Sequence, residues 1–386
     1  MTALGEPVKV CDDLRVHERV IEAEVADVKG ARGAAPAHRS RHGATHATVR
    51  TARTPSTGRR QAMSTTSVDD VLLSVLACPG CGAQLCVEGS DLECAGCSQR
   101  YPVVDGIPRF APAEGYADSF GYQWNRFRAT QLDTVTRVPL SEERFLTETG
   151  WSADWLSDKI VLDVGCGAGR FAEVASRHAR AVIAMDYSSA VHATRANLAD
   201  RPNVHVVQGD VYRLPFRDDA FGGCYCIGVL QHTPDPAAAA LALPRVVRPG
   251  GRIAVTVYER RPLTRLNSKY LLRPLTRRMQ PDQLLLLVRV AMPVLFVASE
   301  VLFRLPALKR VFKHMIPVAN YVDERRLSSR ERYRWAVMDT LDMLSPRYDQ
   351  PQTEDELRSA LSAGGAVSIA RLPNAGLNLV AVTPGT

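Results

Sequence analysis

Apolar and polar positions alternate in blocks along the second half of the chain, and the blocks have two different periods. Short apolar runs typical of buried strands are separated by segments with the spacing of amphipathic helices. The strand-like runs are residues 160–164, 181–185, 205–207, 224–229 and 252–257. Helical segments begin at residues 170, 190 and 237. Strands and helices that take turns with short connections predict a doubly wound, Rossmann-like α/β fold with a mostly parallel sheet.

The end of the chain predicts how this sheet is completed. Thr353-Glu-Asp-Glu356 is a capping box that opens a last helix, which should end at Gly364. Residues 367–372 and 377–382 then read as an antiparallel pair joined through Pro373-Asn374. We therefore expect a seven-stranded sheet whose last strand is antiparallel.

A long insertion, residues 259–349, interrupts the alternation with apolar and basic helical sequence. Its most apolar run, residues 284–303, contains Arg289, Pro293 and Glu300, so we do not expect it to span a bilayer. Two interpretations remain: a lid that packs on the sheet, or a surface that makes peripheral contact with an anionic membrane or a lipid-linked phosphate. The basic residues that favour the second are Arg261, Arg265, Arg273, Arg277, Arg278, Arg304, Lys309 and Arg310.

The start of the chain has no such pattern. Residues 1–62 are rich in Ala, Arg, Thr and His without sustained periodicity, which predicts a disordered segment. Because Met63 opens well-patterned sequence, residues 1–62 are either a mis-called start or a basic tail that contacts nucleic acid.

Composition narrows the class of protein. The chain has 386 residues, 46% of them hydrophobic, which is enough for an α/β core with smaller additions. The formal charge of +7 comes in large part from the Arg-rich start, so it does not by itself indicate nucleic acid. The N-terminus has no signal-peptide core, and the cysteine pattern is that of a reduced protein, so we expect a cytoplasmic location.

Four of the nine cysteines form a strong metal-binding pattern. Cys78, Cys81, Cys94 and Cys97 are spaced C-x2-C-x12-C-x2-C, and two such knuckles complete a tetrahedron of thiolates suited to a structural Zn²⁺. Either pair alone could instead be a redox dithiol. We place a zinc ribbon over residues 68–111 and expect the spare Cys86 to be buried.

A glycine-rich loop follows the first core strand. Gly165-Cys-Gly167-Ala-Gly169 runs into a helix, and such a loop lets a ligand approach backbone N–H groups closely. Its GxGxG spacing differs from the GxGxxG typical of dinucleotide enzymes. Asp186, at the end of the next strand, could accept both hydroxyls of a ribose. Asp186 and Asp210 could also simply cap turns.

Further motifs follow the glycine loop and Asp186 in order: Gly209-Asp-Val211, Leu214-Pro-Phe216, residues 229–236 and Arg248-Pro-Gly-Gly251. With these motifs, residues 160–257 resemble the class I S-adenosylmethionine-dependent methyltransferases with the small-molecule (type 11) motor domain. Gly222 stands where that family usually has Asp. The resemblance implies S-adenosyl-L-methionine as cofactor. It places the methionine end at Asp163 and the backbone of Gly165, Cys166, Gly167 and Gly169, the ribose at Asp186, and the adenine at Asp210 with Val211. Tyr187 and Gly228 are further cofactor-binding residues that it implies.

The ribbon carries a second resemblance. Leu76-Ala-Cys-Pro79 and residues 101–110 are similar to the small zinc-ribbon activator of tRNA and protein methyltransferases. The domain organisation that follows is a linker and N-terminal cap at residues 112–157, a methyltransferase core at 158–258 and 350–386, and the insertion between them. Within the cap, Phe120, Tyr122, Trp124 and Phe127 would either cover the cofactor as a lid or form a helix packing face.

The resemblance implies an enzyme that methylates a small-molecule or lipid-like acceptor at oxygen, nitrogen or carbon. His232 could serve as a general base, or it could only shape the pocket floor. One alternative is an RNA methyltransferase acting on tRNA or rRNA, but residues 227–230, Ile-Gly-Val-Leu, replace the Asn/Asp-Pro-Pro-aromatic tetrad of amino-methylating enzymes. The other is a non-catalytic methyltransferase partner or scaffold.

Overall fold

The computed structural model describes residues 68–112, 115–306, 308–374 and 376–385. Residues 1–62, for which the sequence predicts a disordered or mis-called segment, lie outside the described residues. Val68 to Thr386 form one compact unit.

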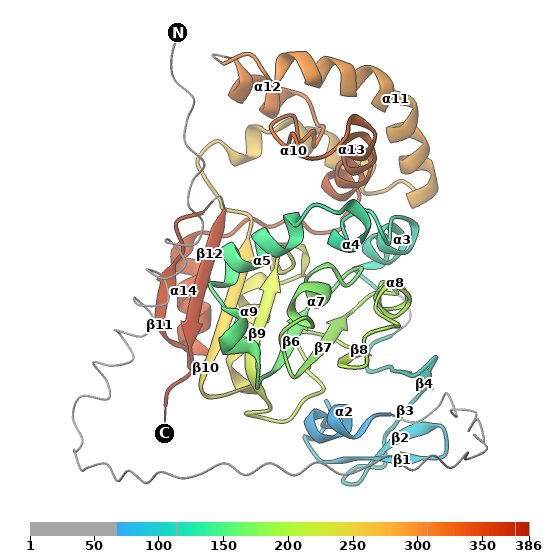
Figure 1. Cartoon of the computed structure of the whole chain (residues 1–386), viewed down its shortest axis with the longest axis vertical. Helices are drawn as coiled ribbons and strands as arrows, with labels where there is room; N and C mark the ends of the chain where they lie inside the picture. The colour runs from blue at the N-terminus through green and yellow to red at the C-terminus, as the bar shows by residue number, and fades with distance from the viewer. Residues whose placement is uncertain (1–67, 113–114, 307, 375, 386) are drawn as a thin grey trace, which may run out of the picture. The chain divides into compact units, whose positions relative to one another are not determined.

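A seven-stranded sheet is the centre of this unit, with strand order β11-β12-β10-β9-β6-β7-β8 (Figure 1). Strands β6 to β10 are parallel where they pair, and β12 runs antiparallel to both β10 and β11. The predicted fold class is therefore confirmed. The strands are β6 Ile160–Val164, β7 Ala181–Asp186, β8 Val204–Gln208, β9 Phe221–Ile227, β10 Val247–Val257, β11 Val367–Arg371 and β12 Leu377–Val382.

Strand order reverses at β6, because β7 and β8 extend the sheet on one side and β9 and β10 on the other. A crevice opens at such a switch point beyond the carboxyl ends of the strands. Strand β9 begins three residues before the predicted start and ends before Gly228. Gly222 and Gly223 lie inside this strand. A Cβ at Gly222 would lie 2.7 Å from the Lys159 side chain, and a Cβ at Gly223 would lie 2.7 Å from the Trp155 ring. The two glycines, which depart from the family pattern, therefore leave room for these side chains.

Helices cover the sheet and supply the cap before it. Thr353 and Glu356 form the predicted capping box of the last helix, and Asp235 caps the helix that begins with Pro236. The cap helices are α3 Asp118–Arg126, α4 Asp133–Thr136, α5 Leu140–Thr149 and α6 Ala153–Leu156. The core helices are α7 Arg170–Ala175, α8 Val191–Asn197, α9 Pro236–Ala242 and α14 Glu354–Ala363, with 3-10 turns η1 Leu230–His232 and η2 Pro244–Val246.

The cysteine-rich segment folds into α2 Asp70–Val75 and small strands, β1 Leu85–Glu88, β2 Asp91–Cys94, β3 Arg100–Tyr101, β4 Val103–Val104 and β5 Ile107–Pro108. Its apolar residues belong to the same hydrophobic core as the sheet, with Leu72 and Leu92 buried alongside Phe216. The Ala77 amide donates to the Pro215 carbonyl at 3.0 Å, and the Arg217 amide donates to the Val75 carbonyl at 2.9 Å. The ribbon is thereby bonded to the loop between β8 and β9.

The insertion contains η3 Thr264–Leu266, α10 Ser268–Thr276, α11 Pro281–Leu302, α12 Lys309–Met315 and α13 Ser329–Leu344. Helix α11 continues through Pro293 for 22 residues, so the proline does not end the helix. Among the described residues, α11 is the one helix long and apolar enough, by length and composition, to cross a membrane. One face of α11 shares a hydrophobic core with α13.

Candidate cofactor and acceptor site

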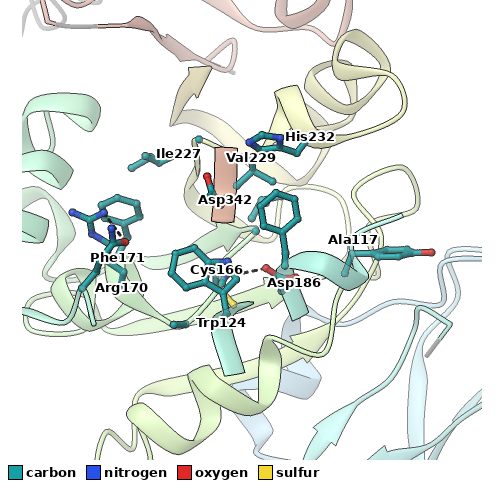
Figure 2. A pocket seen from close by; sticks show the side chains of 18 of the residues that line it. Ala117, Trp124, Cys166, Arg170, Phe171, Asp186, Ile227, Val229, His232 and Asp342 are labelled. Carbon is teal, nitrogen blue, oxygen red and sulfur yellow. Dashed lines mark hydrogen bonds between the residues drawn. The ribbon is translucent and has the colours of Figure 1, made fainter. Parts of the chain in front are cut away.

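A cavity of about 380 Å³ lies at the carboxyl ends of the strands around the switch point. This volume is typical of small-molecule sites. Segments far apart in the sequence form its walls: the glycine loop after β6, the ends of β7 and β9, α3 of the cap, and α13 of the insertion. Figure 2 shows Trp124, Cys166 and Asp186 toward one side of the cavity and His232 with Asp342 toward another.

The glycine loop is held tightly against β7. The amides of Gly165 and Cys166 both donate to the Met185 carbonyl, at 2.7 and 2.9 Å. Gly165 has φ +79°, and a Cβ there would lie 2.4 Å from Val229. A side chain is therefore excluded by both conformation and space. At Gly167 a Cβ would lie 3.0 Å from the Trp124 indole, so the cap lies directly over the loop.

Asp186 connects this loop to the end of β7. Its Oδ2 accepts the Gly167 amide at 2.9 Å, and its Oδ1 accepts the amide and hydroxyl of Ser188 at 2.8 and 2.7 Å. Burial raises the pKa of Asp186, although these hydrogen bonds lower it in part. The side chain does cap a turn, yet it also lines the cavity. Oδ1 already accepts two hydrogen bonds, so the lone pair that remains to accept a ligand hydroxyl is on Oδ2.

The structure separates the other predicted cofactor residues into two groups. Cys166, Tyr187, Val211 and Gly228 line the cavity with Gly165, Gly167 and Asp186. Asp163, Gly169 and Asp210 are not among the lining residues.

The two acids outside the lining have different surroundings. Asp163 is buried beneath the loop, where desolvation holds its pKa well above the ordinary value. Asp210 accepts the Tyr212 amide at 3.0 Å, as a turn cap would. Neither geometry shows direct access to a ligand in the cavity.

The aromatic segment of the cap divides between its two interpretations. Phe120 and Trp124 line the cavity, as a lid would. Tyr122 and Phe127 instead pack against the hydrophobic core that α11 and α13 share. Helix α3 therefore covers the cavity with one set of side chains and anchors to the insertion with the other.

His232 is buried at the top of the cavity, on the turn that follows β9. Its Nδ1 lies 3.0 Å from the Tyr348 carbonyl oxygen. Because a carbonyl only accepts, Nδ1 carries the proton and Nε2 keeps a lone pair. Burial lowers the pKa of His232, although the charges of Asp342 and Asp349 act in the opposite direction. The rings of Phe120 and Tyr258 lie 4.9 and 5.5 Å from the imidazole, centroid to centroid.

The sequence did not predict four charged residues that line the cavity: Arg144, Arg170, Asp339 and Asp342. Desolvation lowers the pKa of Arg170 to about 10 and raises the pKa of Asp339 to about 6. Asp342 accepts a hydrogen bond from the Gln123 amide at 3.1 Å. Only Arg170 had a sequence signal, because it directly follows the glycine loop. The two acids belong to an insertion without a recognisable motif, so nothing in the sequence linked them to the cavity.

The four predicted zinc ligands come together in the ribbon. The sulfur atoms of Cys78, Cys81, Cys94 and Cys97 all lie within 4.8 Å of one another. The Cys81–Cys94 and Cys78–Cys97 sulfur pairs are 3.4 and 3.8 Å apart. A tetrahedral zinc with bonds of about 2.3 Å requires sulfur separations of about 3.8 Å, so the cluster fits the ion.

The surroundings of the cluster agree with a structural site. The Tyr101 hydroxyl lies 3.1 Å from the Cys78 sulfur, where it can donate to a thiolate. The expectation that Cys86 is buried is wrong. It lies on β1, where Leu85 turns toward the core and Cys86 is exposed.

The cavity also fits S-adenosylmethionine on its own features. The glycine loop leaves no room for a Cβ at Gly165, so a ligand can approach its backbone closely, and Asp186 in the cavity wall keeps a lone pair on Oδ2. Gly165, Gly167 and Asp186 would hold the cofactor from this side, with Tyr187 and Val211 beside them. The adjoining space under Phe120, His232 and Tyr258 would receive an acceptor.

Comparison with known proteins agrees with this geometry. Residues 162–255 match the methyltransferase domain family, and residues 69–106 match Trm112p-like proteins. The ubiquinone biosynthesis O-methyltransferase of Acinetobacter baumannii (strain AYE) is 30% identical over 182 residues, which cover 44% of this chain and 72% of the relative. The demethylmenaquinone methyltransferase of Thermobifida fusca is 33% identical over 144 residues, 36% of this chain, and the chain spans only 61% of that relative's length.

Among solved structures, a complex between the Haloferax volcanii Trm112 methyltransferase activator and a methyltransferase is 14% identical, with a TM-score of 0.41, covering 69% of this chain and 98% of that chain. A likeness of this size carries no argument about function. The domain match, the curated relatives and the cavity together show that the chain belongs to the S-adenosylmethionine-dependent methyltransferases, with a Trm112p-like zinc ribbon at residues 69–106.

Proposed function

We propose that this protein transfers a methyl group to a hydroxyl of a small, apolar aromatic acceptor, such as a hydroquinone, with His232 as the proton acceptor. The observation that carries the proposal is the hydrogen bond from His232 Nδ1 to the Tyr348 carbonyl. It leaves a lone pair on Nε2 of a residue that lines the cavity, and a general base needs such a lone pair.

The cavity walls support an apolar aromatic acceptor. Phe120, Ile227, Val229, Tyr258 and Met343 line the same cavity as His232, and the rings of Phe120 and Tyr258 lie beside the imidazole. Aromatic and apolar walls with a few polar groups favour a planar apolar ligand oriented by one hydroxyl. The names of the curated relatives, which refer to ubiquinone and menaquinone chemistry, point in the same direction.

The residues around the acceptor explain how the reaction would proceed. S-adenosylmethionine, when bound, supplies an electrophilic methyl group on a positively charged sulfur. His232 Nε2 would take the proton that the acceptor hydroxyl loses when the methyl group is transferred to its oxygen, with the electron pair of the broken carbon–sulfur bond left on the departing S-adenosylhomocysteine. The negative charge of Asp342 stabilises the imidazolium, because each group shifts the pKa of the other toward its charged form. Holding the acceptor in line supplies much of the acceleration.

Labelled methyl transfer tests the proposal. The purified full chain is incubated with methyl-labelled S-adenosylmethionine and, separately, a short-chain hydroquinone, the matched arylamine and bulk tRNA. We expect one labelled methyl per hydroquinone and little label in the other two. Label in the arylamine or the tRNA with none in the hydroquinone, or no label in any of the three, would overturn the proposal. The tRNA arm tests the RNA-methyltransferase alternative directly.

A further inference from the structure

Helix α11 presents a continuous aliphatic surface to solvent. Six side chains on one side of the helix are between 51% and 74% exposed. We call them the α11 apolar face: Leu286, Leu287, Val290, Val294, Val297 and Val301. At 3.6 residues per turn these positions form one stripe about 22 Å long. Exposed aliphatic stripes of this length are unusual on monomeric proteins and mark a site of interaction.

The opposite side of α11 is part of the protein core. Leu284, Val288 and Met292 are buried against Ala336 and Leu341 of α13. A third of the most apolar stretch of α11 is buried inside the protein, and that part is not available to lipid. Only one side of α11 is therefore free to contact lipid. This arrangement fits a helix that lies in the membrane–water interface, and it does not fit a helix that spans the bilayer.

The insertion that carries this face is strongly basic. Residues 261–315 contain eleven Lys and Arg against two Asp and Glu. Among the described residues, no carboxylate pairs with the exposed Arg265, Arg277, Arg278, Arg289 or Arg310. Neighbouring helices add exposed aliphatic side chains of their own, Leu271 and Leu275 on α10 and Met315 on α12. An apolar surface with unpaired basic side chains around it is complementary to an anionic lipid bilayer.

We infer that the α11 apolar face docks this protein on the surface of an anionic membrane. A second copy of the chain is the competing occupant, and charge argues against it. A symmetric dimer through this face would oppose two surfaces that each carry the same large positive excess. In a bilayer the aliphatic side chains enter the acyl boundary while the arginines contact lipid phosphates.

Docking through α11 would place the membrane beside the catalytic cavity. Helix α13, which packs on α11, contributes Asp339, Asp342 and Met343 to the cavity wall. An apolar acceptor dissolved in the bilayer could thus reach the cavity without crossing water. This step rests on the proposed function, whereas the docking itself does not. A cytoplasmic protein held in this way would be peripheral at the inner surface of the membrane.

Vesicle co-sedimentation of the full chain tests the inference. The probes are vesicles of phosphatidylcholine alone and vesicles with phosphatidylglycerol added. One variant carries Val290→Glu and Val294→Glu on the α11 apolar face. Its matched control carries Val87→Glu and Val367→Glu, which are exposed valines outside the insertion and change the net charge equally. A third variant, Arg277→Glu with Arg278→Glu, tests the electrostatic part.

We expect the wild type and the control to pellet with phosphatidylglycerol vesicles at low salt, and the α11 variant to bind at least about tenfold more weakly. The Arg277/Arg278 variant should bind more weakly too, and salt at about 1 M should reduce binding to anionic vesicles. Equal pelleting of the α11 variant and its control would overturn the inference. So would a dimer, seen by sedimentation velocity, that the α11 variant dissociates while no chain pellets.

Two further readouts separate this result from the proposed function. Calorimetric titration with S-adenosylhomocysteine shows whether each variant keeps a folded cofactor site. Methyl transfer to a water-soluble hydroquinone should be equal in the α11 variant and its control. Vesicle binding without any methyl transfer would leave docking standing and remove the proposed function, and the reverse result would remove docking alone.

Discussion

Asp163, Asp186 and His232 have different roles at the cavity because their surroundings differ. Asp186 and His232 both line the cavity and are buried, whereas Asp163 is sealed beneath the glycine loop. Asp186 keeps one lone pair, on Oδ2, for a ligand in addition to its three hydrogen bonds to protein. Single substitutions at Asp186 and His232 can therefore test cofactor binding and proton transfer separately.

Replacing Asp186 by Ala should weaken cofactor binding. Hydrogen bonds to a charged group contribute about 1.5–3 kcal/mol each, so the affinity for S-adenosylhomocysteine should fall by about 10- to 150-fold. Asp186→Asn, which keeps the shape but not the charge, should lose less. The exposed Asp219 serves as control, and Asp219→Ala should bind as the wild type does. Calorimetric titration measures these affinities; an unchanged value for Asp186→Ala would remove Asp186 from the cofactor site.

His232→Gln should slow methyl transfer to a hydroquinone by about 10²- to 10⁴-fold near neutral pH, the usual contribution of a general base. Burial lowers the pKa of His232, so in the wild type activity should be lost only as the pH falls through a value below about 6.5. The variant should lack this acidic limb but still bind S-adenosylhomocysteine.

The exposed His178 supplies the matched control, and His178→Gln should keep both rate and pH profile. Kinetics between pH 5 and pH 9, about the range in which imidazole titrates, provide the readout. If His232→Gln retained the acidic limb, His232 would only shape the cavity wall.

At the scale of elements, the ribbon and the loop between β8 and β9 form one structural piece. Leu76 bridges to Phe216, and backbone hydrogen bonds join residues 75–77 to residues 215–217. Val211, a few residues before this contact, lines the cofactor cavity. Loss of the metal should therefore weaken cofactor binding, although no cysteine of the cluster lines that cavity.

Cys94→Ser should lower the zinc content and reduce the melting temperature by about 5 °C or more, because metal binding and folding of the ribbon are coupled. Hydrogen exchange at the Ala77 and Arg217 amides should accelerate, and S-adenosylhomocysteine should bind more weakly. The matched control is Cys86→Ser, since Cys86 is exposed and outside the cluster. A Cys94→Ser protein that exchanged at the control's rate would show that the ribbon does not support the loop.

At the scale of the whole molecule, the cavity exists only where three separate parts of the chain meet. The glycine loop supplies its floor, α3 contributes Phe120 and Trp124, and α13 contributes Asp339 and Asp342. Shared packing of Tyr122 and Phe127 with the core of α11 and α13 connects cap and insertion. Movement of the insertion, for example on a membrane, would therefore be transmitted to both walls of the acceptor space.

The sequence by itself determined the parts that depend on local chemistry. Alternating periods predicted the sheet and its antiparallel end, glycine spacing predicted the loop of Gly165 and Gly167, and cysteine spacing predicted the metal ligands. These features are short in range, since a turn, a strand or a metal knuckle is specified by neighbouring residues.

Only the tertiary structure decided which distant side chains share the cavity. Asp339 and Asp342 carry no local motif, and their role follows from how α13 packs over the strand ends. Packing also separated Asp163 and Asp210 from the cavity lining, although the resemblance treats them like Asp186, as cofactor-binding residues. In α11 the same holds for Pro293: local propensity predicts a break, but burial of Val288, Met292 and Phe296 against α13 stabilises the continuous helix. Burial and long-range packing are properties of the folded chain, and they override local preference wherever enough apolar surface is enclosed.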